Sequence, residues 1–117
     1  MNTYRASRLG ILIRNLISEM MIRKIKDPRV RLATITEVAM ESNMRVARVY
    51  YSVQGDEEML QMVDKGLQSA KGFIKRELAR ILELRFMPEL LFEYDVSLNR
   101  AQRIKDLLNL GLIIYVL

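Results

Sequence analysis

The sequence predicts an α+β domain in which helices cover one face of a three-stranded mixed sheet. The chain has 117 residues, the length of one domain, and half of them are hydrophobic, which argues against disorder. Helical and strand-like periodicities follow one another in the order helix, strand, strand, helix, helix, strand and tail helix. Two helices separate the second and third strands, so these strands cannot form a hairpin and the sheet is expected to be mixed.

The first helix is expected to begin with Thr3 as its cap and to run to about Lys26. Asp27-Pro28 should end it, because the residue before a proline is pushed out of the helical region. Apolar side chains recur at helical spacing on one of its faces. They are Leu9, Leu12, Ile13, Leu16 and Met20.

Two strands are expected next. Residues 33–40 are rich in β-branched types, and their imperfect alternation allows a bulge. Residues 47–53 alternate cleanly, with Arg48 and Tyr50 on the polar face. The turn at residues 41–44 predicts that the two strands form an antiparallel hairpin.

The chain is organised around residues 57–97. Asp56 can cap a helix whose apolar stripe keeps its spacing through the short break Ala70-Lys71-Gly72. A glycine inside a helix costs about 1 kcal/mol relative to alanine. Gly72 is therefore expected either to kink one helix or to separate two, and it leaves the backbone bare for a partner. An alternating strand at residues 90–96 follows.

A short last helix is expected after Ser97 or Asn99, with Gly111 as its stop. The segment 112–117 is apolar throughout and is expected to cover the core, extend the sheet or meet a partner. We therefore expect a core at residues 1–98, with residues 99–117 as a C-terminal helix and tail of the same domain.

The net charge of +5 is concentrated in the first quarter of the chain. Residues 1–31 hold eight Lys and Arg residues and two acids, whereas the remaining eleven basic and twelve acidic residues nearly cancel. Such a local surplus indicates a polyanionic partner. For Arg23 and Lys24 the alternative is a solvated helix end, where cations also suit the helix dipole.

The composition excludes several classes of protein. The chain has no cysteine and no histidine, which excludes disulfides, thiol chemistry, zinc fingers and imidazole catalysis. No nucleophile, metal cluster or phosphate-binding glycine loop is visible, so we expect no enzyme, no catalytic residue, no metal and no cofactor. No signal peptide or membrane span is visible, so we expect a soluble, cytoplasmic protein.

The central stretch has the layout of a KH-like RNA-binding core, and nearly the whole chain resembles the ribosome-binding factor A family. The resemblance rests on several motifs that occur in the right order and at the right spacing. They are Arg5 and Arg8 leading into Asp27-Pro28-Arg29-Val30, Thr34 to Val38, Ala47 to Gly55, Ala70 to Ala79, Leu84-Arg85, Pro88-Glu89-Leu90, and Phe92, Asp95, Ser97, Ile104 and Leu107-Leu108. The apolar end after Gly111 and the turn with Met44-Arg45 depart from the family pattern.

The resemblance implies a type II KH-like fold in which an Ala-x-Gly kink, Ala70 to Gly72, replaces the usual Gly-x-x-Gly loop. It also implies a monomeric factor that binds the small (30S) ribosomal subunit and its 16S rRNA during late maturation. Such a factor assists processing of the 5′ end of that rRNA and folding of its 5′-terminal helix, supports growth in the cold, and works alongside other assembly factors. The alternative is a protein-interaction module, or a homodimer, that uses the apolar tail.

The expected RNA-binding cations are Arg5, Arg8, Lys24, Lys26, Arg29, Arg31, Lys71, Lys75, Arg76, Arg80 and Arg85. From the charge pattern alone, the group at residues 71–85 suits a solvated helical face equally well. Among the aromatic residues Tyr50 is the best candidate for stacking on a base, although a plain cross-strand pair is the alternative. The other aromatic residues, Tyr4 and Phe86 among them, could in principle stack on bases too, but most of them are expected in the core.

Overall fold

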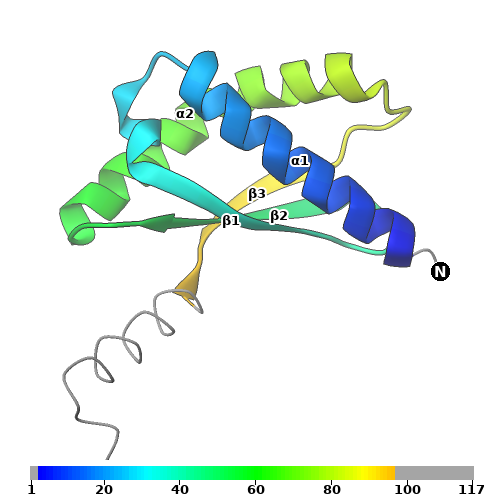
Figure 1. The fold of residues 1–117 in the computed structure, drawn as a ribbon, viewed down its shortest axis with the longest axis horizontal. Coiled ribbons are helices and arrows are strands. Elements are labelled where there is room, and N and C mark those ends of the chain that lie inside the picture. The colour runs from blue at the N-terminus through cyan, green and yellow to red at the C-terminus, as the bar shows by residue number, and fades with distance from the viewer. Residues whose placement is uncertain (1–2, 97–117) are drawn as a thin grey trace, which may run out of the picture.

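The structure, a computed structural model, describes residues 3–96 (Figure 1). The elements are α1 (Thr3–Arg23), the 3-10 helix η1 (Pro28–Leu32), β1 (Ala33–Met40), β2 (Val46–Val53), α2 (Glu57–Leu82) and β3 (Glu89–Tyr94). The α+β class is confirmed. The predicted tail helix, its cap and stop, and the apolar segment 112–117 lie outside the described residues.

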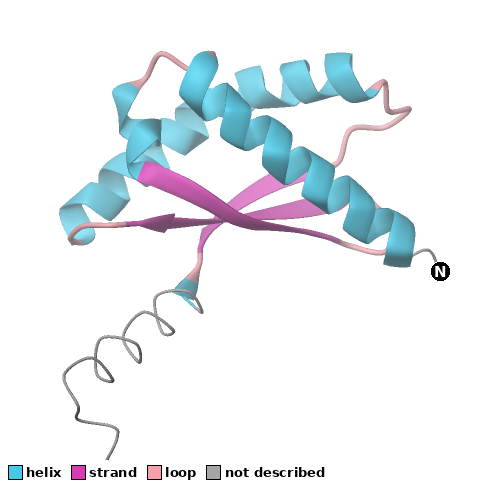
Figure 2. Cartoon of the chain, viewed as in Figure 1, coloured by secondary structure: helices cyan, strands magenta, loops and turns pink. Residues whose placement is uncertain are grey.

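The sheet is mixed, as predicted, and its strand order is β1-β2-β3. β1 and β2 pair antiparallel with a bulge between Ile35 and Glu37, and β2 and β3 pair parallel. Both long helices lie on the same face of the sheet (Figure 2). Parallel neighbours need a crossover connection, and α2 provides it, because it carries the chain from the end of β2 back to the start of β3.

The core lies between this face of the sheet and the two helices. Side chains at predicted helical and alternating positions are fully buried there: Ile13 of α1, Leu67, Ile74 and Leu78 of α2, and Val49 and Leu90 of the sheet. On α1 the prediction is wrong for Leu12, which is 45% exposed, and Ile17 is fully buried although it is not in the predicted set. No polar or charged side chain among residues 3–96 is buried. Every charged group of the site described below is therefore at or near the surface.

Two glycines allow the helices to approach their neighbours closely. A Cβ atom at Gly10 of α1 would lie 2.5 Å from the carbonyl oxygen of Val38 in β1. A Cβ atom at Gly66 of α2 would lie 3.0 Å from Cβ of Arg29 and 3.3 Å from Cγ1 of Val30, both in η1. These glycines are therefore required by packing and not by backbone conformation.

The central helix differs from one of the two predictions for Gly72. α2 is a single helix, so the alternative that Gly72 separates two helices is wrong. Figure 1 shows that the helix axis changes direction near its middle. Gly72 is exposed, and the only atom near a Cβ added there would be Nη1 of Arg76, at 3.4 Å. The core therefore does not require a glycine at this position.

The exit from α1 also differs from the prediction. The helix ends at Arg23 and not near Lys26, because the N–H of Ile25 donates to the carbonyl of Met20, five residues back, at 2.9 Å. Asp27 and Pro28 do not simply stop a helix but start the 3-10 helix η1, with Asp27 as its cap. Val30 of η1 is fully buried, so this short element is part of the core.

Candidate nucleic-acid interface

The predicted cations lie on five parts of the fold. Arg5 and Arg8 are at the start of α1, and Lys24 and Lys26 follow its end. Arg29 and Arg31 lie on η1, and Lys71, Lys75, Arg76 and Arg80 lie on the second half of α2. Arg85 lies in the loop between α2 and β3. The structure therefore gathers these residues into separate groups, which differ in how many acidic neighbours they have.

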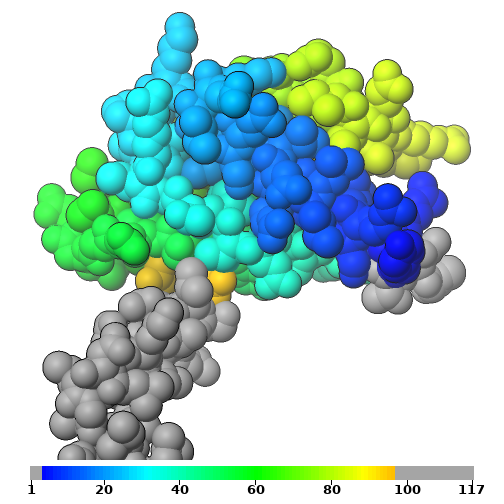
Figure 3. All heavy atoms as spheres, viewed as in Figure 1, coloured from blue at the N-terminus to red at the C-terminus, as the bar shows by residue number. Residues whose placement is uncertain are grey.

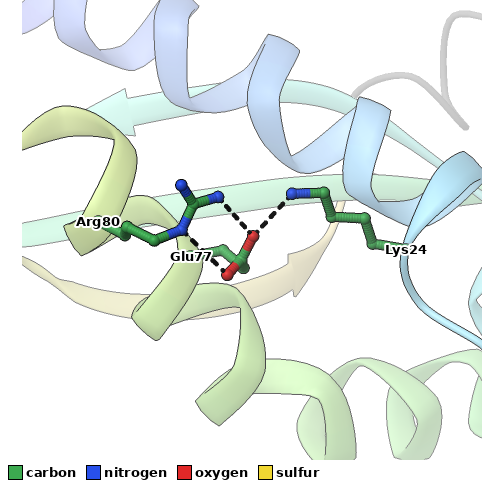
Figure 4. Close-up of polar contacts among 3 residues, drawn as sticks. All are labelled: Lys24, Glu77 and Arg80. Atoms are coloured by element: carbon green, nitrogen blue, oxygen red, sulfur yellow. Dashed lines mark hydrogen bonds and ion pairs between the residues drawn. The ribbon is translucent and has the colours of Figure 1, made fainter.

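One group forms where the end of α1 meets α2 (Figure 4). Oε1 of Glu77 accepts from Nζ of Lys24 at 2.8 Å and from Nη2 of Arg80 at 3.0 Å. The hydrogen bonds from Arg80 and Lys24 lower the pKa of Glu77 to about 2, and the pKa of Arg80 is raised. One carboxylate thus ties α1 to α2 and offsets one of the two positive charges.

A second carboxylate does the same on the other flank of α2. Glu89, the first residue of β3, forms ion pairs with Nζ of Lys71 at 2.8 Å and with Nζ of Lys75 at 3.3 Å. The hydrogen bonds from these lysines lower the pKa of Glu89, and the bond from Lys71 has the larger effect. The two lysines are therefore engaged with the sheet, and together with Glu89 they leave one net positive charge.

Arg29 has a structural role. Both oxygens of Asp27 accept from its guanidinium, with Nη2 to Oδ2 at 2.6 Å, and Oδ1 also accepts from its backbone N–H at 3.0 Å. This pairing lowers the pKa of Asp27 and raises that of Arg29. Cβ of Arg29 also faces Gly66 of α2. The predicted binding residue is thus bound to its own helix cap and packs on α2.

Of the predicted cations after α1, on η1 and on α2, three are exposed and form no ion pair with any residue of the 3–96 range: Lys26, Arg31 and Arg76. The same holds for Arg8 and Arg85. Arg76 lies one turn after Gly72, on the side of α2 opposite the buried Ala70 and Ile74. Lys26 follows Lys24, and Arg31 lies beside Ile22 of α1. We call Lys24, Lys26, Arg31, Arg76 and Arg80 the helix-junction surface.

The remaining predicted cations lie at the other end of α1. Arg5 and Arg8 line one hollow, and Arg5 and Arg85 line the next. Tyr4 and Phe86 are exceptions to the expectation that most aromatic residues lie in the core, since they are 74% and 78% exposed. One occupies the first turn of a helix and the other a loop, where no second layer covers them.

The outer face of the sheet does not suit a polyanion. Tyr50 stands between Glu37 of β1 and Glu93 of β3 in the strand register. Arg48 donates to Oε1 of Glu93 at 2.9 Å and also lies near Glu41. Tyr50, the stacking candidate from the sequence, therefore has an acidic neighbour on each side. These carboxylates would repel the phosphate of a nucleotide stacked on the ring.

Within residues 3–96 no cluster of acidic side chains is arranged to hold a metal ion. The same range contains no helix long and apolar enough to span a membrane. What the described residues offer is a set of exposed cations on a rigid scaffold, which is an arrangement for binding phosphates.

The chain is similar to known proteins of one family. The sequence model of a family described as ribosome-binding factor A matches residues 5–108. A ribosome-binding factor A from Dictyoglomus thermophilum is 48% identical over 110 residues, which cover 92% of each chain. The solution structure of a Thermotoga maritima protein described as a ribosome binding factor A is 31% identical, with a TM-score of 0.68 over 78% of this chain and 87% of that one.

A second set of similar coordinates is described with a partner. It is a homology model of a Thermus thermophilus ribosome binding factor A, fitted into a cryo-electron-microscopy map of its complex with the 30S subunit. This chain is 25% identical to it, with a TM-score of 0.60 over 75% of this chain and 92% of that one.

Proposed function

The chain belongs to the ribosome-binding factor A family, and from this premise we propose that it binds the small ribosomal subunit through 16S rRNA. The structure has the type II KH-like fold of this family. The description of the Thermus relative in complex with the 30S subunit supports the partner. We further propose that the protein acts as a monomer late in maturation, beside other assembly factors, and supports processing of the rRNA 5′ end without catalysing it.

The observation that carries the proposal is the helix-junction surface. Sequence segments around residues 24 and 80 meet at Glu77, and exposed cations without ion pairs extend the surface on both sides. Phosphate contacts of this kind supply affinity and position but little sequence preference. We therefore assign the contacts to Lys26, Arg31 and Arg76 first, and to Lys24 and Arg80 where rRNA displaces part of their pairing with Glu77.

The experiment is the salt dependence of binding to purified small subunits, measured by co-sedimentation. Each neutralised phosphate contributes roughly 0.7 to 0.9 to the slope of log affinity against log salt. The double variant Lys26→Ala/Arg76→Ala should make that slope shallower by about 1.5 while leaving the unfolding temperature unchanged. Arg29 is not a suitable target, because its loss would also remove its pairing with Asp27.

The matched control is Arg14→Ala/Lys65→Ala, which removes the same charge from cations outside the helix-junction surface. A control slope that falls as much as the slope of Lys26→Ala/Arg76→Ala would mean that only net charge matters, and a flat slope in the parent protein would refute phosphate contact. The alternative of a homodimer rests on residues 112–117, which lie outside the described range. It predicts a molecular size that depends on protein concentration and ignores salt.

A further inference from the structure

Two adjoining hollows lie where the start of α1 meets the loop after α2. The first has a volume of about 650 Å³ and is bounded by the first half of α1. The second has a volume of about 570 Å³ and lies between the turn after β1 and the loop after α2. They share Arg5, Met44 and Leu84 as walls. Figure 3 shows the start of α1 in blue and the loop after α2 in yellow-green at the same end of the molecule.

Each hollow has an exposed aromatic ring beside an arginine. The guanidinium carbon of Arg8 lies 5.8 Å from the ring centroid of Tyr4, and that of Arg85 lies 5.4 Å from the ring centroid of Phe86. The two aromatic residues are about three-quarters exposed, at 74% and 78%. Each guanidinium covers part of one face of its ring. Because both residues are largely exposed, ring surface remains open to a planar group from outside.

The charge of these hollows is of one sign. Arg5, Arg8, Arg45 and Arg85 line them, and no Asp or Glu of the described residues does. This differs from α2, where Glu77 and Glu89 each offset a pair of cations. We call Tyr4, Arg8, Met44, Arg45, Arg85 and Phe86 the arginine–aromatic surface.

We propose that the arginine–aromatic surface binds single-stranded RNA, with unstacked bases on Tyr4 and Phe86 and phosphates on Arg8, Arg45 and Arg85. Open rings among cations are the combination that single strands use, because every base has a face to stack and every nucleotide a phosphate. A duplex keeps its base faces stacked inside and would leave both rings unused. A protein partner with an apolar surface would have to bury these arginines without carboxylates to pair them.

This inference rests on the proposed function and adds a second contact to it. α1 lies between Arg8 of the second surface and Lys24 of the first, and its 21 residues span about 30 Å. On α2 the two surfaces come closer, because Arg80 is five residues before Arg85. The helix-junction surface offers cations without open rings, whereas the arginine–aromatic surface offers both. We therefore assign backbone contact to the first surface and the capture of an unpaired rRNA segment to the second.

The test uses the absence of tryptophan from the chain. Phe86→Trp places a single tryptophan in the proposed stacking position, and Met62→Trp places one in an exposed position in the first half of α2 as a control. Each full-length variant is titrated with a single-stranded RNA of roughly 12 nucleotides, within the size range of single-strand sites. Binding is followed at the same time by the anisotropy of a label on the RNA.

The expected result is quenching of the tryptophan at position 86, in step with the anisotropy, and none at position 62. The double variant Tyr4→Leu/Phe86→Leu should weaken single-strand binding by roughly 5- to 150-fold per stacked base and leave duplex binding unchanged. Both positions are exposed, so neither substitution should change the unfolding temperature.

Three results would overturn the inference. One is RNA that binds without quenching at position 86, and another is the absence of single-strand binding at low salt. The third is a double variant that loses small-subunit binding but keeps single-strand binding, which would assign the surface to a ribosomal protein. If the parent protein binds the single strand but not the small subunit, the proposed function fails and this inference stands.

Discussion

Two glycines on the same helix should respond to alanine in opposite directions. Gly72 is exposed, its φ is outside the left-handed region, and an added Cβ would meet only the flexible end of Arg76, at 3.4 Å. Alanine there removes conformational freedom from the unfolded chain and adds no clash. Gly72→Ala should therefore stabilise the domain by about 0.4 to 1 kcal/mol.

Gly66 has the same gain in helix propensity available, but η1 occupies the space. The added Cβ would lie 3.0 Å from Cβ of Arg29 and 3.3 Å from Cγ1 of Val30. Neither atom is the end of a flexible chain, since the Arg29 backbone is bound to Asp27 and Val30 is fully buried. Overpacking of this kind costs roughly 1 to 3 kcal/mol, so Gly66→Ala should be destabilising by about 0 to 2 kcal/mol net.

The assay is urea unfolding followed by circular dichroism, with thermal unfolding as a second measure. The two variants should differ by at least about 1 kcal/mol, which for a domain of this size is roughly 3 to 6 °C in unfolding temperature. Gly10→Ala should be at least as unfavourable as Gly66→Ala, because its Cβ would meet the backbone oxygen of Val38 at 2.5 Å. A Gly66→Ala protein as stable as Gly72→Ala would refute the packing argument.

Three further outcomes are expected. The bonds to Arg80 and Lys24 lower the pKa of Glu77 from 4.5 to about 2, so its contribution to stability should be complete above pH 4.5 and lost as the pH falls toward 2. In Glu77→Gln the unfolding temperature should therefore depend less on pH over that range. Tyr51, whose pKa is raised from 10 to about 12 by burial and by Asp64, should contribute stability that is lost as the pH rises from 10 to 12, and Tyr51→Phe should reduce that loss. If the bend of α2 positions cations for rRNA, Gly72→Ala should weaken co-sedimentation with small subunits although it stabilises the fold, and full co-sedimentation would show that the glycine has no role in binding.

The sequence predicts well those parts of the fold that depend on the local spacing of apolar residues. Leu67, Ile74 and Leu78 fall on one helical stripe and are fully buried. Ala47, Val49 and Tyr51 alternate along β2 and are buried on the face that the helices cover. A one-residue shift would expose each set, so the pattern leaves little choice of face. The strand order depends on how α2 crosses the sheet, and no local pattern specifies it.

The sequence also does not show which glycines are required by close packing. In the sequence Gly72 attracts attention because it interrupts a basic helical stretch, whereas Gly10 and Gly66 sit within ordinary helical periodicity. Close approach is a property of the neighbouring element, and η1 reaches Gly66 from a distant part of the chain. A Pro-containing turn such as Asp27-Pro28 gives no indication of which helix it will pack against.

The sequence predicts which cations belong to the candidate site, but it does not show which of them are paired with acidic residues. Glu77 meets Lys24 across 53 residues of sequence, and Glu89 reaches back to Lys71. The sequence does not distinguish Tyr4 and Phe86 from the aromatic residues of the core, because Tyr and Phe are usually buried when the core has room for them. Tyr4 and Phe86 lie at a chain end and in a loop, where the two-layer fold ends.

The two carboxylates on the flanks of α2 decide where its charge is available. Glu77 bridges Lys24 and Arg80 on one flank, and Glu89 bridges two lysines on the other, so each flank keeps a single net positive charge. Arg76 lies on the ridge between the flanks and forms no ion pair with a described residue. A phosphate approaching α2 therefore meets Arg76 without competition from a carboxylate, whereas contact with either flank must displace an existing ion pair. The positive charge of α2 that is available without breaking an ion pair is therefore that of Arg76, on the exposed side of the helix. The carboxylates that neutralise part of the charge on the flanks, Glu77 and Glu89, also hold α2 to the end of α1 and to β3.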